Sequence, residues 1–123
     1  MKQRRTIVPT ERLFSNAKFH RLGCHGQHLL LRMYAGSCRW GRGPASAQGV
    51  VAQLSLLPDF GADIEVLLEL LHRLSFIQIY DVDGQQYYQI NHYDQDQLAD
   101  MLRKRGASPF PARPSSPSEG GQG

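Results

Sequence analysis

The change of apolar period between Ile64 and Ile90 is the feature that most constrains what this chain can fold into. Up to Leu74, apolar residues recur at the spacing of one face of an α-helix. From Phe76 onward, β-branched and aromatic residues take over, and Asp83-Gly84 separates two strand-like runs as a type I′ turn would. The stretch therefore predicts a helix that leads directly into a two-stranded hairpin.

A two-residue turn also fixes which residues of the hairpin face each other. The predicted pairs run from Val82 opposite Gln85 to Ile77 opposite Ile90. Because side chains alternate along a strand, one face suits a core and the other carries an uncharged aromatic patch, which we expect to be exposed. The core face has Ile77, Ile79, Tyr88 and Ile90, and the second face has Gln78, Tyr80, Tyr87 and Gln89.

Apolar stripes and capping residues predict the remaining elements. Helices are expected over residues 10–14, after Asn16, over 28–36, after Ser46, from Asp63 and over 95–105, with Thr10, Asn16, Ser46 and Asp63 as caps and a short extended segment at 40–44. This order predicts an α+β winged helix-turn-helix, with about four or five helices and a C-terminal two-stranded wing. Residues 1–9 are expected to form a basic arm and residues 10–105 the winged-helix domain. Residues 106–123 are expected to be a disordered tail, because four of the seven prolines lie there among Ser and Gly.

Charge is divided along the sequence. Residues 1–58 hold nine Lys or Arg against one acid, whereas residues 59–100 hold nine acids against Arg73 alone. The C-terminal stretch is again basic. A winged helix permits this division to become a division in space, with a basic surface on the early helices and an acidic one on the third helix and wing.

The two cysteines and the absence of a long apolar run limit the classes of protein. Cys24 and Cys38 have no Cys-x-x-Cys spacing, so we expect both to be reduced. Cys24 and His28 would share a helix face, but their spacing matches no standard zinc pattern, and no metal site is predicted. No run approaches the roughly 18 apolar residues of a membrane span, and the N-terminus lacks the apolar segment of a signal peptide. We therefore expect a cytoplasmic protein with no membrane partner.

The sequence resembles the N-terminal winged-helix domain of bacteriophage replisome organisers and related phage replication-initiation proteins. The resemblance covers residues 4–93 and lies in Arg5-Thr6-Ile7-Val8-Pro9, Phe14 to Leu22, Gly41-Arg42, Leu57-Pro58, Leu67 to Leu74, Phe76-Ile77, Tyr80, Gly84, Tyr87 or Tyr88, and Ile90. It implies a winged-helix fold and a role in phage replication. Where family members follow the last strand with a basic segment, this chain has Asp94-Gln95-Asp96-Gln97.

A winged helix usually binds DNA with its third helix in the major groove and its wing on the backbone. Here that helix carries Glu65 and Glu69 and the wing tip carries Asp81 and Asp83, so this face would repel phosphate. We therefore expect double-stranded DNA to be bound by the basic parts of the chain, although the same charges also suit an ordinary solvated surface. The predicted nucleic-acid-binding residues are Lys2, Arg4, Arg5, Arg39, Trp40, Arg42, Arg103, Lys104 and Arg105.

The acidic helix and the tyrosine face of the wing are predicted to bind a protein partner, because uncharged aromatic patches are enriched in interfaces. The predicted partner-binding residues are Glu65, Glu69, His72, Gln78, Tyr80, Tyr87 and Gln89. Two other interpretations stay open. The last helix covers the tyrosine face, or the complementary charges lead to self-association, most simply as a closed homodimer.

The sequence thus favours a DNA-binding accessory or regulatory protein of phage or mobile-element type, acting in replication or transcription. The alternative is a protein-interaction module that does not bind DNA, such as a phage inhibitor that occupies a host protein's nucleic-acid site. We expect no enzyme and no cofactor, because the chain has no Gly-rich phosphate loop, no recognisable Ser/His/Asp set and no His-Glu-x-x-His motif.

Overall fold

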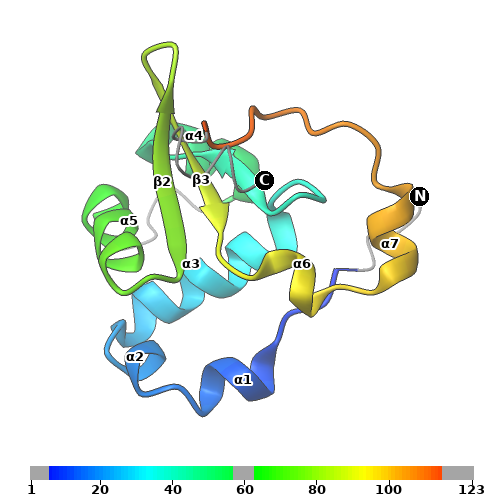
Figure 1. Ribbon diagram of the computed structural model, residues 1–123. Coiled ribbons are helices and arrows are strands. Elements are labelled where there is room, and N and C mark those ends of the chain that lie inside the picture. The colour runs from blue at the N-terminus through cyan, green and yellow to red at the C-terminus, as the bar shows by residue number, and fades with distance from the viewer. Residues whose placement is uncertain (1–5, 57–62, 115–123) are drawn as a thin grey trace.

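A three-stranded antiparallel sheet with helices packed on one face forms the fold of residues 6–56 and 63–114, the part of the chain that the computed structural model describes. The elements are α1 (Thr10–Phe14), α2 (Ala17–His20), α3 (Gly23–Gly36), β1 (Arg42–Pro44), α4 (Ala47–Leu54), α5 (Ile64–Arg73), β2 (Ile77–Val82), β3 (Gln85–Ile90), α6 (Tyr93–Asp96) and α7 (Ala99–Lys104). Figure 1 shows α5 beside β2, with the hairpin projecting beyond the helices. The predicted α+β class is confirmed, and the topology is compatible with a winged helix.

The predicted hairpin register is confirmed at all six pairs, from Val82 opposite Gln85 to Ile77 opposite Ile90. Asp83 and Gly84 have φ angles of 53° and 82°, as a type I′ turn requires. The extended segment β1 pairs antiparallel with β3, which places β3 in the centre of the sheet, in the order β1-β3-β2.

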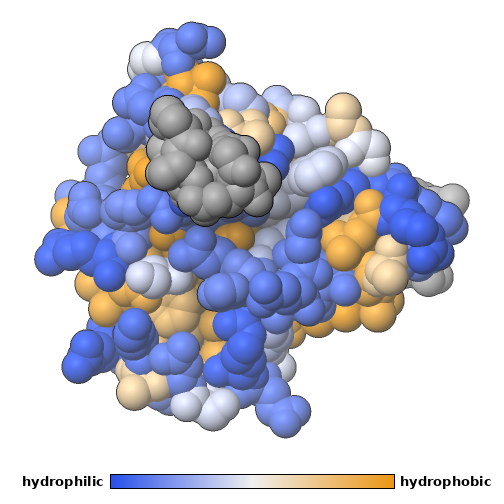
Figure 2. Space-filling model, viewed as in Figure 1, coloured by the Kyte–Doolittle hydropathy of each residue, from blue (hydrophilic) through white to orange (hydrophobic). Residues whose placement is uncertain are grey.

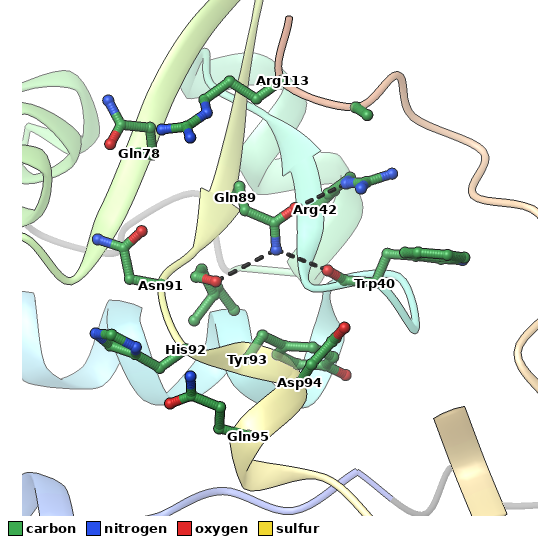
Figure 3. Close-up of a pocket in the computed structure, with 12 residues that line it drawn as sticks. Trp40, Arg42, Gln78, Gln89, Asn91, His92, Tyr93, Asp94, Gln95 and Arg113 are labelled. Carbon is green, nitrogen blue, oxygen red and sulfur yellow. Dashed lines mark hydrogen bonds between the residues drawn. The ribbon is translucent and has the colours of Figure 1, made fainter. Parts of the chain in front are cut away.

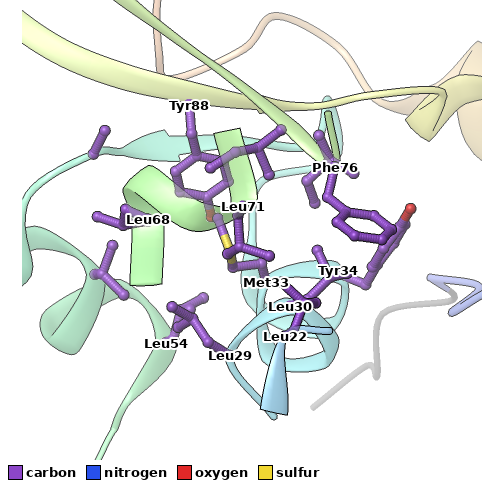
Figure 4. Packing of buried hydrophobic residues seen from close by; sticks show 14 of the residues in the cluster. Leu22, Leu29, Leu30, Met33, Tyr34, Leu54, Leu68, Leu71, Phe76 and Tyr88 are labelled. Atoms are coloured by element: carbon purple, nitrogen blue, oxygen red, sulfur yellow. The ribbon is translucent and has the colours of Figure 1, made fainter. Parts of the chain in front are cut away.

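The core lies between the sheet and helix α3, which crosses beneath it (Figures 1 and 4). The predicted stripe of α3 is buried, with Leu29, Leu30 and Met33 fully enclosed. Leu68 and Leu71 of α5 and Tyr88 of β3 close over it from the other side. Truncation of one such leucine to alanine typically costs about 2–5 kcal/mol, so this cluster fixes how α5 and the hairpin sit on the body.

Three of the four predicted helix caps are confirmed. The side chain of Asn16 accepts from the Lys18 N–H, that of Ser46 from the Gly49 N–H, and that of Asp63 from the Glu65 and Val66 N–H groups. The prediction for Thr10 is wrong. Pro9 takes the cap position of α1, and its side chain has no group that accepts a hydrogen bond.

The predicted last helix over residues 95–105 is wrong, because it is divided into α6 and α7 at Gln97 and Leu98. Both residues are extended, with ψ angles of 158° and 140°. The buried side-chain amide of Gln97 pairs with the backbone of Ile7: the Ile7 N–H donates to Oε1 (2.8 Å) and Nε2 donates to the Ile7 carbonyl (2.9 Å). Gln97 thereby anchors the N-terminal segment and is not helical itself, and α7 begins only after Leu98. Partly for this reason, the described residues contain seven helical segments rather than four or five.

The prediction of a disordered tail is wrong for residues 106–114, which follow a defined course back to the sheet (orange in Figure 1). The indole Nε1 of Trp40 donates to the Gly106 carbonyl (2.9 Å), and the Tyr80 hydroxyl donates to the Pro111 carbonyl (2.6 Å). The composition is still that of a flexible segment, but Phe110 and Pro111 meet an aromatic surface that holds them. Residues 115–123 of the predicted tail lie outside the described residues, as do residues 57–62.

The face of the molecule seen in Figure 2 is predominantly hydrophilic, including most of the projecting hairpin tip. None of the described helices is long and apolar enough to cross a membrane.

We predict that Gln97→Ala lowers the free energy of unfolding by about 1–3 kcal/mol, because it leaves the N–H and the carbonyl of Ile7 without their partner. Urea denaturation followed by circular dichroism measures this. Gln95→Ala, at an exposed position of α6, is the matched control and should stay within about 0.5 kcal/mol of the wild type. Equal losses in the two variants would show that the Gln97 pairing contributes nothing.

Candidate functional site

Two guanidinium groups from distant parts of the sequence meet on the ring of Trp40. The guanidinium carbon of Arg42 lies 4.9 Å from the ring centroid, and that of Arg105 lies 3.4 Å from it. We call Trp40, Arg42 and Arg105, together with the exposed neighbour Arg39, the cationic cluster. The structure thus brings together four of the nine residues that the sequence predicts to bind nucleic acid.

A tight loop before β1 presents Trp40. Gly41 has a φ of 73°, and a Cβ there would lie 2.5 Å from the ring of Tyr93, so the position requires glycine. The Gly41 N–H donates to the Cys38 carbonyl (2.8 Å), and the Ile90 N–H donates to the Gly41 carbonyl (2.8 Å). The loop is therefore fixed to the end of the central strand, and Trp40 has a defined place at the edge of the sheet.

Gln89 connects this loop to the sheet (Figure 3). The Arg42 Nε donates to Gln89 Oε1 (2.7 Å), while Gln89 Nε2 donates to the Trp40 carbonyl (2.8 Å). The sequence predicts Gln89 as a partner-binding residue on an exposed face. In the structure it is half-buried and orients Arg42 instead.

A groove of about 410 Å³ adjoins the cationic cluster. It is lined by polar groups of the sheet and of the turn after β3, among them Gln78 and Asn91, and by Arg113 (Figure 3). The sequence does not indicate Arg113 as a site residue, because it lies on a segment whose composition predicts disorder. Only the aromatic-proline pair Phe110-Pro111 in that segment signals that it could pack.

The cations near Trp40 differ in how free they are to contact a ligand. The side chain of Arg105 is only 12% exposed and donates to both carboxylate oxygens of Asp94 (2.7 and 3.1 Å), so it supports Trp40 rather than facing solvent. Arg103 and Lys104 pair with Asp100 (2.9 and 3.4 Å) at exposed positions, where such pairs contribute little and exchange easily. Lys2, Arg4 and Arg5 lie outside the described residues.

The expected division of charge in space is therefore only partial. Asp94 and Asp100 lie among the cations, and Asp96 pairs with Arg12 (2.6 Å). The acids of α5 lie elsewhere. Arg42 shares the sheet face of Gln89, with which it pairs, whereas α5 covers the opposite face, where Ile79 lies.

Glu65, Glu69 and His72 meet as predicted, in a groove of about 680 Å³ between α5, the hairpin and the turn from β1 to α4. We call it the acidic groove. None of the described residues that line it is a Lys or Arg. The Ile79 N–H donates to His72 Nδ1 (3.1 Å), which joins α5 to β2 and leaves Nε2 to carry the ring proton of the neutral imidazole.

The predicted exposed tyrosine patch is wrong. Tyr80 is only 8% exposed and Tyr87 is half-buried, because residues 106–114 cover the face they share. Burial raises the pKa of Tyr80, against a smaller opposing effect of Arg42. Since side chains alternate along the strands, this face lies opposite the acidic groove, and the predicted partner surface falls into two separate parts.

Within residues 6–56 and 63–114, no group of three or more His, Cys, Asp or Glu side chains is placed to hold a metal ion. Cys24 and Cys38 are both free thiols. Comparisons with protein-family models, with curated proteins and with solved structures found no match.

We predict that Arg105→Ala exposes Trp40. The substitution removes the guanidinium that stacks on the indole ring, and it also removes the ion pair with Asp94 that holds this guanidinium in place. Trp40 is the only tryptophan, so its fluorescence should shift to the red and iodide should quench it more strongly. The free energy of unfolding should fall by about 1 kcal/mol. Lys104→Ala, at the neighbouring exposed residue, should leave the fluorescence unchanged. If iodide quenches the Trp40 fluorescence equally in the two variants, Arg105 does not cover the indole ring.

Proposed function

We propose that this chain is a winged-helix DNA-binding accessory or regulatory protein of phage or mobile-element type. In this proposal α4 and α5 form the helix-turn-helix and β2-β3 forms the wing. The element order and the strand order β1-β3-β2 support the assignment, as does the resemblance of residues 4–93 to phage replication proteins.

The cationic cluster around Trp40 is the observation that carries the proposal. Arg39 stands on the loop before β1 and Arg42 is the first residue of β1. Arg103 and Lys104 lie on α7, just before Arg105, whose guanidinium contacts the Trp40 ring as that of Arg42 does. Several guanidinium and ammonium groups on rigid elements suit the phosphate backbone of a duplex. Helix α5, by contrast, exposes Glu65 and Glu69, which phosphates would repel.

The attachment of the N-terminal segment supports the same surface. Ile7 is held by Gln97, between α6 and α7, so the predicted basic arm joins the body beside α7. The arm brings three cations, Lys2, Arg4 and Arg5, to the chain that begins there. Contacts of this kind read the backbone rather than the bases, so binding is strongly salt-dependent and weakly sequence-specific.

We predict that Arg39→Ala with Arg42→Ala weakens binding to duplex DNA. If both residues contact phosphate, the slope of log affinity against log salt should fall in magnitude by about 2, since each lost contact removes about 0.9. Fluorescence anisotropy of a labelled duplex over a salt series measures this. Lys18→Ala with Arg21→Ala, at exposed positions in and just after α2, makes the same change in net charge and is the matched control.

The proposal fails if no binding is detected at low ionic strength. It also fails in its choice of surface if the control pair reduces the slope as much as the Arg39/Arg42 pair. In that case only the net charge of the chain attracts DNA.

A second candidate function is the binding of a basic protein segment in the acidic groove. The observation that favours it is the lining, in which Glu65 and Glu69 lie on one side of a groove without a described Lys or Arg. The basic arm of a second copy fits this charge, which would give a homodimer. The alternative ligand for the acidic groove is a basic segment of a host protein.

We predict that Glu65→Gln with Glu69→Gln lowers the affinity for a labelled peptide of residues 1–9 by about two- to tenfold, because two exposed charge pairs are lost. Isothermal titration calorimetry measures this. Glu11→Gln with Asp100→Asn, at exposed positions outside the groove, gives the same charge change and should have little effect. Light scattering shows whether the wild type is a dimer that the groove variant dissociates. A peptide that binds both variants equally would not occupy this groove.

A further inference from the structure

Residues 106–113, which we call the strap, lie on the sheet face that carries Tyr80 and Tyr87. We propose that this face is a docking groove for an extended segment with an aromatic residue followed by proline, presented by a protein partner. The strap occupies the groove within the chain and is displaced when the partner binds. This inference does not rest on DNA binding, because Tyr80 and Tyr87 lie outside the cationic cluster.

The contacts of the strap define what the groove recognises. The Tyr80 hydroxyl donates to the Pro111 carbonyl (2.6 Å), and the Tyr87 ring lies 6.3 Å from the ring of Phe110. The two tyrosine rings are themselves 6.0 Å apart, so they form one continuous aromatic floor. An aromatic floor with a hydroxyl that donates to a backbone carbonyl suits an extended proline-containing chain, which is already stiff and has unpaired carbonyls.

The strap presents Phe110 through a local turn. Ser108 Oγ accepts from the Phe110 N–H (3.1 Å) and donates to the Phe110 carbonyl (2.7 Å). This turn needs no other part of the protein. A free segment with the same residues can therefore adopt it and offer the same ring and carbonyl to the groove.

The strap is held weakly enough to be displaced. Among the described residues, no backbone–backbone hydrogen bond joins it to the sheet. Its contacts include those at the side chains of Trp40, Tyr80 and Tyr87, and a long contact of 3.7 Å between Cys38 Sγ and Ser108 Oγ; Arg113 at its end makes a further one. Segments with so few backbone hydrogen bonds open at a small fraction of the free energy of global unfolding.

The groove is buried only while the strap is present. Tyr80 is enclosed although it stands on the sheet face opposite the helices, and Phe110 remains half-exposed on top of it. Removal of the strap, whose Ala112 and Arg113 line the same groove as Gln78 and Gln89, would leave two tyrosines at the surface beside these amides. Such an aromatic patch, with amide groups and Arg42 at its margin, is typical of a protein interface.

The test uses the full-length chain and a fluorescein-labelled peptide of residues 106–114, GASPFPARP. In the wild type the peptide competes with a tethered strap at high effective concentration, so it should bind weakly. Phe110→Ala in the protein loosens the strap and should increase the affinity for the peptide at least fivefold. Phe14→Ala, at a 52% exposed aromatic position on α1, is the matched control and should leave the affinity for the peptide unchanged.

The role of the Tyr80 hydroxyl is tested in the Phe110→Ala protein, in which the strap is loosened. Tyr80→Phe combined with Phe110→Ala should reduce the affinity about two- to tenfold relative to Phe110→Ala alone, because one hydrogen bond is lost without a change of shape. A peptide that carries the Phe110→Ala change should not bind either protein. If circular dichroism shows that Phe110→Ala unfolds the chain, Ser108→Ala replaces it, since it removes the turn and the long contact to Cys38 and keeps the Phe110 ring.

The inference is overturned if the loosened protein binds the peptide no more tightly than the wild type. It is also overturned if Tyr80→Phe has no effect, since the peptide would then bind elsewhere.

Discussion

The alternation of side chains along β3 is the constraint on which both surfaces of this protein depend. Tyr88 points inward, and its hydroxyl donates to Gln53 Oε1 (2.7 Å), while Gln53 Nε2 donates to the Arg42 carbonyl (3.0 Å). The next residue, Gln89, points outward and holds the Arg42 side chain and the Trp40 carbonyl. One central strand thus fixes α4 and β1 on one side and the cationic cluster on the other. A shift of one residue in its register would exchange the two sets of groups.

Local chemistry explains why much of the fold was predictable from the sequence. The Asp83-Gly84 turn determines the hairpin register, and the caps Asn16, Ser46 and Asp63 determine where three helices begin, because each acts on neighbours within a few residues. The break of the last helix was not predictable, since it depends on an amide that pairs with Ile7, 90 positions away. The covering of Tyr80 by Pro111 likewise requires knowledge of where a segment without periodicity returns.

In the candidate site, too, contacts between residues that are distant in the sequence could not be predicted. The sequence indicates which residues are charged, and the acidic groove follows from the spacing of Glu65, Glu69 and His72 on one helix. It does not indicate which cations are used internally. Arg105 pairs with Asp94 and stacks on Trp40, whereas Arg39 is exposed to solvent. The residues next to each arginine in the sequence do not predict this difference. The blocks of like charge along the chain therefore overstate the separation of charge in space, because Asp94, Asp96 and Asp100 all pair with cations.

The pairing of Gln97 with Ile7 has a geometric consequence for anything that the N-terminus does. Because Ile7 is fixed at the junction of α6 and α7, the first five residues are tethered at a known point on the body. Five residues span at most about 17 Å when fully extended. The Cα atom of Lys2 can therefore lie no farther than about that distance from the Cα atom of Ile7, so whatever the arm contacts must lie close to the junction of α6 and α7.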